Sequence, residues 1–432
     1  MKHIDKEKVV VIGAGPMGLS VAYHLCKKGV TPLVYEAGPE VGGMTVTFDF
    51  GGLPMERFYH FHCTSDVDAI RMLKELGLED KLCWVKTKMG YFYQGKIYDW
   101  GDPFSLFRFP HLGFVSKLRY ALHAFTSTKR KDWHGLDQKG AVDWIKFWIG
   151  EKAFDVLWSK LFSCKFYHLS DQISAAWIWD RIHRIGNSRY NLFEEKLGYI
   201  EGGSQTLIHG LRDKIVQNGG EIHLSCPIEK VVIENQKVKG IQTKHGFVAC
   251  SKVISTAPLP YVSSMVPDFP QTIKEQYSRV KNIAVVCVIV KLKKKVTDKF
   301  WLNVNDDTMD IPGIVEYTNL RPLGDHIVYV PFYMPGELQK YQDSDEVYEQ
   351  KVRSYLRTIN TSLVDEDFLD ICVSRYRYAQ PVCTPGFVSM LPPITGVFDG
   401  LWVADTSYYY PHDRGISESF GFGKTLVEKA LS

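Results

Sequence analysis

Three glycines near the start of the chain have the spacing of a phosphate-binding turn. Gly13, Gly15 and Gly18 follow a β-branched run at residues 8–12, and apolar residues recur at helical spacing over residues 16–28. The first glycine permits a sharp turn, the second lets the backbone approach a diphosphate, and the third lets helix and strand pack closely. The free N–H groups of the helix N-terminus can then bind phosphate. The pattern predicts a dinucleotide-binding strand–turn–helix unit.

An acidic residue closes the next expected strand, at residues 32–35. Glu36 lies 36 − 13 = 23 residues after Gly13, close to the roughly 20 expected for a carboxylate that binds the ribose of adenosine. A carboxylate at this point would repel a 2′-phosphate. The sequence therefore disfavours NADP at this site.

The residues after Glu36, AGPEVGGMTVTFDFGG, resemble those of a flavoprotein superfamily that includes amine oxidases, protoporphyrinogen oxidases, phytoene desaturases and UDP-galactopyranose mutases. In these families a glycine pair, matched here by Gly42 and Gly43, passes beneath the phosphates and ribityl chain of the flavin. The resemblance implies FAD as cofactor. The arginine that commonly follows the pair is Met44 here, so one diphosphate contact is missing. Cys383 lacks the surroundings of a flavin-linking cysteine, which implies noncovalent binding.

The resemblance continues in the segments at residues 199–258 and 400–431. It implies that the backbone of Ile228 holds the adenine, that residues 256–258 lie near the dinucleotide, and that Asp405, preceded by Ala404 instead of the usual glycine, faces the ribityl chain. The last helix would aim its N-terminus at the pyrimidine edge of the flavin, with Ser417 as its N-cap. The expected cofactor-binding residues are Gly13, Ala14, Gly15, Pro16, Met17, Gly18, Glu36, Ala37, Gly42, Gly43, Met44, Thr45, Ile228, Ala257, Asp405, Gly415, Ile416 and Ser417.

A histidine is the first candidate for a catalytic role. The segment RFYHFHCTSD resembles the part of UDP-galactopyranose mutases in which a histidine six residues before an aspartate lies beside the flavin; Asp66 then indicates His60. A neutral imidazole could accept a hydrogen bond or tune the flavin. The alternative is a buried histidine with no catalytic role. His62 is expected to face away, because side chains alternate along a strand.

Arg414 is the second candidate, because it directly precedes the helix expected to approach the flavin. Its guanidinium could bind an anionic substrate or a cofactor phosphate. A structural ion pair with Asp413 or Glu418 is the alternative. The mutases carry a different arginine-and-tyrosine signature here, and its absence counts against mutase activity. No metal-ligand cluster or Ser/His/Asp set is readable.

The composition of the 432-residue chain is that of a globular enzyme. Its net charge of +3 gives no global field for nucleic acid, and its nine cysteines, without paired spacing, indicate reduced thiols. The start of the sequence lacks the apolar region of a signal peptide, and no apolar run is long enough to span a bilayer. These features predict a cytoplasmic protein.

The predicted fold is α/β: a Rossmann-type FAD domain with an inserted α+β substrate domain. The FAD domain takes residues 1–95, 197–264 and 391–432; the substrate domain takes 96–196 and 265–390, a helical lobe plus a mixed sheet. Expected strands lie at 221–224, 228–234, 239–243, 253–255, 283–291, 313–317 and 326–332. The apolar, basic segment 102–125 is either a membrane-touching patch or a lid or packed surface helix. The prolines Pro103 and Pro110 favour the second.

The resemblance implies a FAD-dependent oxidoreductase of the amine oxidase or protoporphyrinogen oxidase type, which moves a hydride from a C–N or C–C bond to the flavin. The abundant aromatic residues suggest a small-molecule substrate that is bulky or planar. Two alternatives stay open: a non-redox, nucleotide-sugar mutase-like enzyme and a non-catalytic flavin-binding protein. The departures at Met44, Ala404 and the C-terminal arginine signature keep both open.

Overall fold

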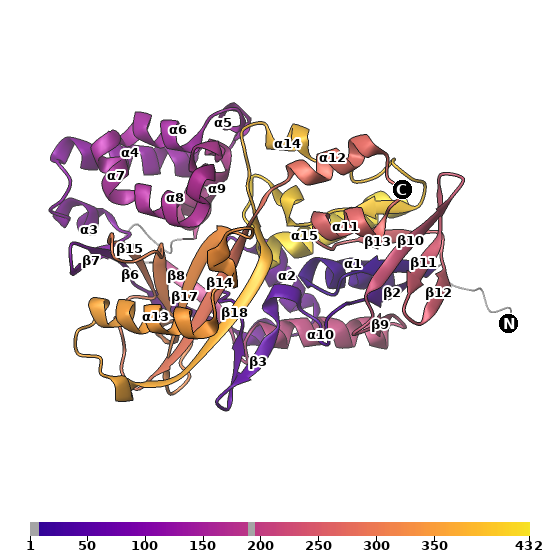
Figure 1. Cartoon of the computed structure of the whole chain (residues 1–432), viewed down its shortest axis with the longest axis horizontal. Coiled ribbons are helices and arrows are strands. Elements are labelled where there is room, and N and C mark those ends of the chain that lie inside the picture. Colours follow the sequence, from indigo (N-terminus) through magenta and orange to yellow (C-terminus); the bar gives the residue numbers. More distant parts are fainter. Residues whose placement is uncertain (1–7, 189–194) are drawn as a thin grey trace.

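The computed structural model describes residues 8–188 and 195–432. Residues 1–7, where the absence of a signal peptide is expected, and residues 189–194 lie outside the described residues. The chain forms three bodies of secondary structure: a nucleotide-binding unit, a seven-stranded sheet and a helical lobe (Figure 1). The predicted α/β class is confirmed.

The nucleotide-binding unit is built on a five-stranded parallel sheet in the order β19-β13-β1-β2-β9. Its strands β1 and β2 read KVVVI and TPLVY, the nearly continuous apolar runs that a sheet covered on both faces requires. The five strands are β1 (Lys8–Ile12), β2 (Thr31–Tyr35), β9 (Glu221–His223), β13 (Val253–Ser255) and β19 (Leu401–Val403).

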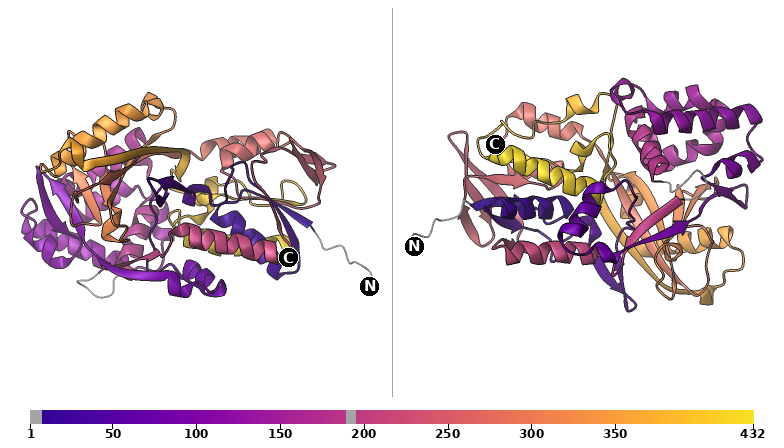
Figure 2. Two further views of the ribbon diagram at one scale, coloured as in Figure 1. Left: turned by 90° about the horizontal axis from the view of Figure 1, so that it is seen from below. Right: turned by 180° about the vertical axis from the view of Figure 1, so that it is seen from behind.

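Helices cover one face of this sheet and a small antiparallel sheet covers the other. Val9 and Val11 of β1 pack with the helices, whereas Val10 and Ile12 pack with the strand residues of the opposite layer. Figure 2 shows α15, α1 and α10 side by side. The helices are α1 (Pro16–Lys27), α2 (Val67–Glu75), α10 (Ser204–Gln217) and α15 (Ile416–Leu431); the antiparallel strands are β10 (Ile228–Glu234), β11 (Lys237–Thr243) and β12 (Gly246–Ala249).

The seven-stranded sheet has the order β18-β14-β17-β16-β15-β6-β7 and is antiparallel except where β15 meets β6. Residues of β14 alternate: Val286 and Val288 pack against helix α13 (Asp345–Ile359), and Val285 and Cys287 face the interior of the molecule. The strands are β6 (Met89–Tyr93), β7 (Lys96–Trp100), β14 (Asn282–Leu292), β15 (Trp301–Asn305), β16 (Gly313–Glu316), β17 (His326–Pro335) and β18 (Phe368–Pro381).

The helical lobe lies above this sheet, at the upper left of Figure 1. It contains α3 (Pro103–Arg108), α4 (Phe114–Lys129), α5 (His134–Asp137), α6 (Ala141–Ile149), α7 (Glu151–Leu157), α8 (Ser159–Phe166) and α9 (Ala175–Asn187). The remaining elements connect the three bodies: β3 (Thr47–Phe50), β4 (Leu53–Glu56), β5 (Leu82–Thr87), β8 (Glu195–Ile200), α11 (Leu259–Met265), α12 (Gln271–Arg279) and α14 (Phe387–Met390).

The fold differs from the sequence analysis at several points, and two strands of the larger sheet, β15 and β18, were not expected. Strand β12 was not expected, although it pairs with β11 over four residues. The seven-stranded sheet also takes in β6, which ends at Tyr93, before the residue at which the substrate domain was predicted to begin. The boundary at residue 95 falls inside the β6–β7 hairpin, because a turn marks a hairpin as readily as a linker between domains.

A buried ion pair joins the helical lobe to the nucleotide-binding unit. Arg184 of α9 donates to both carboxylate oxygens of Asp66, with Nη2 at 2.9 and 3.0 Å and Nε at 3.2 Å. Asp66 directly precedes α2 and is 4% exposed. Its second oxygen also accepts the N–H of Cys63, so the carboxylate is fully hydrogen-bonded.

We predict that Arg184→Met destabilises the protein by about 3–5 kcal/mol, because it leaves the Asp66 charge buried without its partner. Urea unfolding followed by circular dichroism measures the change. The matched control is Arg212→Met, which breaks an exposed pair with Asp213 and should cost less than about 1 kcal/mol. Equal losses in the two variants would contradict a linking role for the buried pair.

Candidate active site

A large cavity lies where the three bodies meet. Its floor is the carboxyl edge of the parallel sheet, where β1, β13 and β19 end next to Gly15, Thr256 and Asp405. Its roof comes from the seven-stranded sheet and the helical lobe, which contribute Tyr333 and Lys165. Ligands of open α/β sheets bind at this edge, beyond the carboxyl ends of the strands.

The structure brings twelve of the twenty predicted site residues to this cavity. They are Gly15, Pro16, Met17, Gly18, Gly43, Met44, Thr45, His60, Asp405, Arg414, Gly415 and Ile416. The other eight lie outside its lining: Gly13, Ala14, Glu36, Ala37, Gly42, Ile228, Ala257 and Ser417. Of these eight, Glu36 and Gly42 hydrogen-bond to Ala14 of the glycine turn.

Backbone atoms pack so closely at the glycine turn that a side chain on Gly18 or Gly43 would meet them. Gly13 has φ +97°, and a Cβ on Gly18 would lie 1.9 Å from the carbonyl oxygen of Gly13. A Cβ on Gly43 would lie 3.2 Å from the Cα of Gly15, and these two glycines meet backbone to backbone. The result is a slot lined by main chain, of the kind that admits a diphosphate.

The first turn of α1 supplies hydrogen-bond donors to this slot. The helix has no side-chain cap, and its first intrahelical bond runs from the N–H of Leu19 to the carbonyl of Gly15. The N–H groups of Met17 and Gly18 therefore precede the hydrogen-bonded part of the helix, and both residues line the cavity. Free N–H groups together with the helix dipole favour a phosphate at this place.

Glu36 lies at the end of β2, beside the glycine turn. Its carboxylate accepts the N–H of Ala14 at 2.7 Å and the N–H of Gly38 at 2.8 Å. Gly42 donates its N–H to the carbonyl of Ala14 at 2.8 Å, which fixes the glycine pair against the same turn. The carboxylate is thus held against the glycine turn by backbone N–H groups.

Asp405 is a buried carboxylate on the cavity wall. It accepts the N–H groups of Leu259 and Ser407, both at 2.9 Å. Burial raises its pKa, and these hydrogen bonds offset only part of the effect. The position suits a group that accepts hydrogen bonds from hydroxyls of a bound ligand.

The N-terminus of α15 faces the cavity without a side-chain cap. Its N-cap is Gly415, and both Gly415 and Ile416 line the cavity. The prediction that Ser417 caps this helix is wrong. The Ser417 hydroxyl instead accepts the N–H groups of Asp68 and Ala69, both at 3.2 Å, and so caps the neighbouring helix α2. The uncapped N–H groups of α15 remain available to a ligand.

His60 lines the cavity and is oriented by a buried glutamate. Its Nδ1 lies 2.5 Å from Oε2 of Glu56, whose other oxygen accepts the N–H of Ser204 at 2.9 Å. Burial opposes ionisation of Glu56, but the hydrogen bonds from His60 and Ser204 outweigh it and lower the pKa of Glu56. Because an ionised Glu56 can only accept, Nδ1 of His60 donates to it, and this hydrogen bond fixes the orientation of the ring.

His62 also lines the cavity, which corrects the expectation that it faces away. Residues 59–63 form no regular strand; only His62 bridges to Gly198, through hydrogen bonds of 2.8 and 2.7 Å. Side-chain alternation therefore does not apply to this segment. Burial lowers the pKa of His62.

Arg414 forms neither of the ion pairs considered from the sequence. Its Nη1 donates to Oε1 of Gln380, and only its backbone N–H donates to Asp413, at 3.0 Å. The Asp413 carboxylate is instead paired with Arg181 of α9. The guanidinium of Arg414 thus lines the cavity with a neutral partner.

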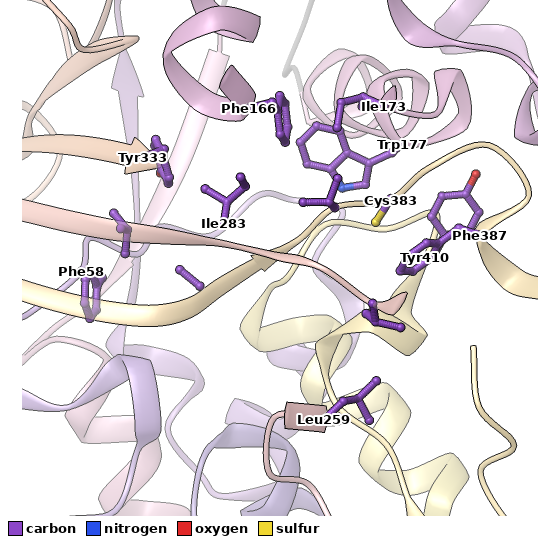
Figure 3. Close-up of a cluster of buried hydrophobic side chains, with 14 of the residues drawn as sticks. Phe58, Phe166, Ile173, Trp177, Leu259, Ile283, Tyr333, Cys383, Phe387 and Tyr410 are labelled. Atoms are coloured by element: carbon purple, nitrogen blue, oxygen red, sulfur yellow. The ribbon is translucent and has the colours of Figure 1, made fainter. Parts of the chain in front are cut away.

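The sequence analysis missed the aromatic and cationic wall opposite the glycine turn. Tyr59, Trp301, Tyr333 and Tyr376 line this wall together with Lys165. Figure 3 shows Tyr333 on its strand across from Phe166 and Trp177 of the helical lobe. No motif marks these residues, since they come from separate elements that only the folded chain brings together. Within residues 8–188 and 195–432, no group of His, Cys, Asp and Glu is arranged to hold a metal ion.

Comparison with known proteins agrees with this geometry. A model of the flavin-containing amine oxidoreductase family matches residues 18–388. The chain belongs to this family. Membership implies FAD as the cofactor, and the main-chain slot, the two uncapped helix N-termini and the Glu36 carboxylate fit its diphosphate, flavin and ribose.

Individual relatives are distant in sequence and close in fold. A 15-cis-phytoene desaturase from Synechococcus elongatus is 22% identical over 326 residues, which are 67% of this chain and 66% of the relative. A structure assigned as a protoporphyrinogen oxidase from Exiguobacterium sp. 255-15 is 18% identical, covers 98% of both chains and has a TM-score of 0.75. A reduced UDP-galactopyranose mutase, 16% identical over 99% of this chain and 96% of its own, has a TM-score of 0.74. The chain spans about half to two thirds of the length of the curated relatives it matches.

We predict that Gly15→Val folds but binds FAD about tenfold or more weakly. A Cβ on Gly15 meets nothing closer than the Cα of Gly43 at 4.0 Å, so the branched side chain would fill the slot that a diphosphate needs. Titration with FAD, followed by flavin fluorescence, measures the affinity, and the thermal midpoint of the FAD-free protein measures folding. Gly113→Val is the control, because a Cβ there meets nothing within 4 Å. Unchanged FAD affinity in Gly15→Val would contradict the assignment of the slot.

Proposed function

We propose that the protein oxidises a small molecule by removing a hydride from one of its C–N or C–C bonds, with noncovalent FAD as the acceptor. The observation that carries the proposal is the continuous cavity, which runs from the main-chain slot at Gly15 to the aromatic wall at Tyr333. A cavity of this form accommodates a dinucleotide at one end and a substrate at the other. The family match supports the chemistry.

The proposed placement of FAD follows the features of the cavity. The diphosphate lies at the glycine turn and the N-terminus of α1, the ribose at Glu36, and the adenine at the backbone of Ile228. The ribityl chain lies at Asp405, and the pyrimidine edge lies at the N-terminus of α15. Cys383, the one cysteine considered for a covalent link, is buried outside the cavity lining, which supports noncovalent binding.

When bound, FAD supplies the two-electron acceptor, and the chain supplies orientation, charge and exclusion of water. Tyr59 and Tyr333 form part of a wall that can pack on a bulky or planar substrate. His60, whose Nδ1 is engaged by Glu56, can use its Nε2 to exchange a proton or a hydrogen bond with the substrate. Arg414 can bind a negative group near the N-terminus of α15.

The proposed compartment is the cytoplasm. The described residues include all nine cysteines, and no disulfide joins any two of them. Free thiols in this number suit a reducing compartment.

We predict that the purified protein is yellow and that acid precipitation releases its FAD into the supernatant. Amines, porphyrinogens and polyene precursors are then added separately under anaerobic conditions, without reductant. One of these three classes of compound should bleach the flavin absorbance. Air or another acceptor should restore the colour. The matched control is Gly15→Val, which should stay colourless in the same assays.

Two outcomes would contradict the proposal. Turnover of a nucleotide sugar only after reduction with dithionite would indicate the mutase-like activity that the fold also accommodates. Stable FAD binding with no bleaching by any of the three classes, and no turnover of nucleotide sugars, would indicate a flavin-binding protein without catalysis.

A further inference from the structure

The charged groups around the cavity are paired except for two cations. Arg184 is paired with Asp66, Arg181 with Asp413, and His412 with Asp180, where Nδ1 lies 2.8 Å from the carboxylate. Asp405 is satisfied by backbone N–H groups. Lys165 and Arg414, which both line the cavity, have no carboxylate within ion-pairing distance among residues 8–188 and 195–432.

Lys165 lies inside the molecule in an aromatic enclosure. It is 4% exposed, and its Nζ lies 5.0 Å from the ring centres of Trp177 and Tyr333 and 5.7 Å from that of Phe166. No acceptor in the described parts of the chain takes a hydrogen bond from this ammonium group. Burial lowers the pKa of Lys165 well below its usual value, the charges of Arg181 and Arg414 lower it further, and the charge of Asp413 opposes them. An anion bound beside the amine would favour its charged form. A lysine held in this way lacks a partner of opposite charge.

Arg414 belongs to the same end of the cavity. Its neutral partner Gln380 is 1% exposed at the end of β18, so the guanidinium is fixed without neutralisation. Tyr333, whose ring faces Lys165, lines the same cavity as Arg414. The two side chains are therefore open to one common ligand.

We propose that Lys165 and Arg414 bind an anionic group of the substrate, a carboxylate or a phosphate ester. The inference rests on the proposed function, because it assigns the substrate class to the same cavity. The diphosphate of FAD has a separate place at the N-terminus of α1, so it does not account for these two cations. The surrounding rings would pack on an apolar or planar part next to the anionic group.

The test uses the FAD-loaded protein and two probes, inorganic phosphate and benzoate, at constant ionic strength. At least one probe should give a saturable change in flavin absorbance and in the tryptophan fluorescence, to which Trp177, with its ring centre 5.0 Å from Nζ, contributes. In Lys165→Met and in Arg414→Gln the dissociation constant should rise about tenfold or more. Lys160→Met, on the same helix α8 but outside the cavity lining, is the control and should bind like the parent protein.

The result also separates this inference from the proposed function. A protein that takes up FAD and is bleached by substrate, but shows no saturable response to either probe, overturns only the anion site. Unchanged affinity in Lys165→Met overturns it as well. If the protein takes up no FAD, the proposed function is wrong. The tryptophan fluorescence then still reports whether the anions bind.

A second surface stands out on the outer side of the helical lobe. Seven large apolar side chains are exposed on α3 and α4, and an eighth, Phe147, is 76% exposed at the end of α6. On α4 they recur at the spacing of one helical face, and α3 continues it through a ring contact of 6.2 Å between Phe107 and Phe114. We call these residues the α3–α4 face: Phe104, Phe107, Phe114, Val115, Leu118, Leu122, Phe125 and Phe147.

The charge of this segment is of one sign. Residues 103–131 contain six cationic residues and no Asp or Glu: Arg108, Lys117, Arg119, Lys129, Arg130 and Lys131. Arg119 also ties Phe147 to the face, because its guanidinium donates to the carbonyls of residues 147 and 148. An apolar face on a segment whose charges between Asp102 and Asp132 are all positive complements a surface that is apolar inside and anionic outside.

We infer that the α3–α4 face docks on a lipid bilayer that contains anionic lipids. The sequence analysis favoured a packed surface helix because of two prolines, but Pro103 starts α3 and Pro110 lies between the helices, so α4 runs uninterrupted over sixteen residues. No helix in the described ranges is long and apolar enough to cross a bilayer. Contact would therefore be limited to the headgroup region and the outer acyl chains.

Co-sedimentation with vesicles tests this surface. The FAD-loaded protein should bind vesicles made from equal amounts of phosphatidylglycerol and phosphatidylcholine. It should bind vesicles of pure phosphatidylcholine about tenfold more weakly. The double variant Phe114→Glu, Leu122→Glu should lose about tenfold or more of the binding. Phe247→Glu is the control, since that residue is 53% exposed on β12, away from the lobe.

Three results would overturn the inference: no binding of the parent protein to the anionic vesicles, equal binding by the double variant, or equal binding to both lipid mixtures. Gel filtration of the vesicle-free protein adds a further check. A dimer that the double variant converts to a monomer would show that a second copy of the chain, and not a bilayer, covers this face.

Discussion

The close approach of two backbones, at Gly15 and Gly43, is the constraint on which the rest of the site depends. Neither position tolerates a side chain without filling the space between them, and this space is where the donors of α1 are unpaired. A diphosphate held there sets the direction of the whole cofactor. In the proposed placement, one end extends past Glu36 and the other into the cavity toward Asp405 and the N-terminus of α15.

Local patterns made much of this predictable from the sequence. Strands β1, β13 and β17 begin at the expected residues, because buried strands leave uninterrupted apolar runs. The glycine turn is predictable for a different reason: only glycine permits φ +97° at residue 13 and a backbone contact at residue 18. Because the backbone at these two positions requires glycine, the glycines in the sequence indicate that backbone geometry.

The rest of the site depends on packing between distant segments, which leaves no mark on the local sequence. Ser417 has the position of an N-cap on its own helix, yet its hydroxyl serves α2, nearly 350 residues away. Lys165 occupies an ordinary position on an amphipathic helix, and only the arrangement of Trp177 and Tyr333 makes it a buried cation. Likewise, β6 joins the larger sheet through a parallel partner, β15, that follows it by more than 200 residues.

The helical lobe connects the two surfaces for which ligands are proposed. Helix α4, which carries the exposed apolar face, packs against α9, where the indole N–H of Trp179 donates to the carbonyl of Ser127 at 2.9 Å. Helix α9 in turn carries Arg181 and Arg184 on the cavity wall. The proposed bilayer-docking face and part of the wall of the cavity therefore lie on helices that pack directly on each other, so a change in the packing of α4 on α9 would act on both.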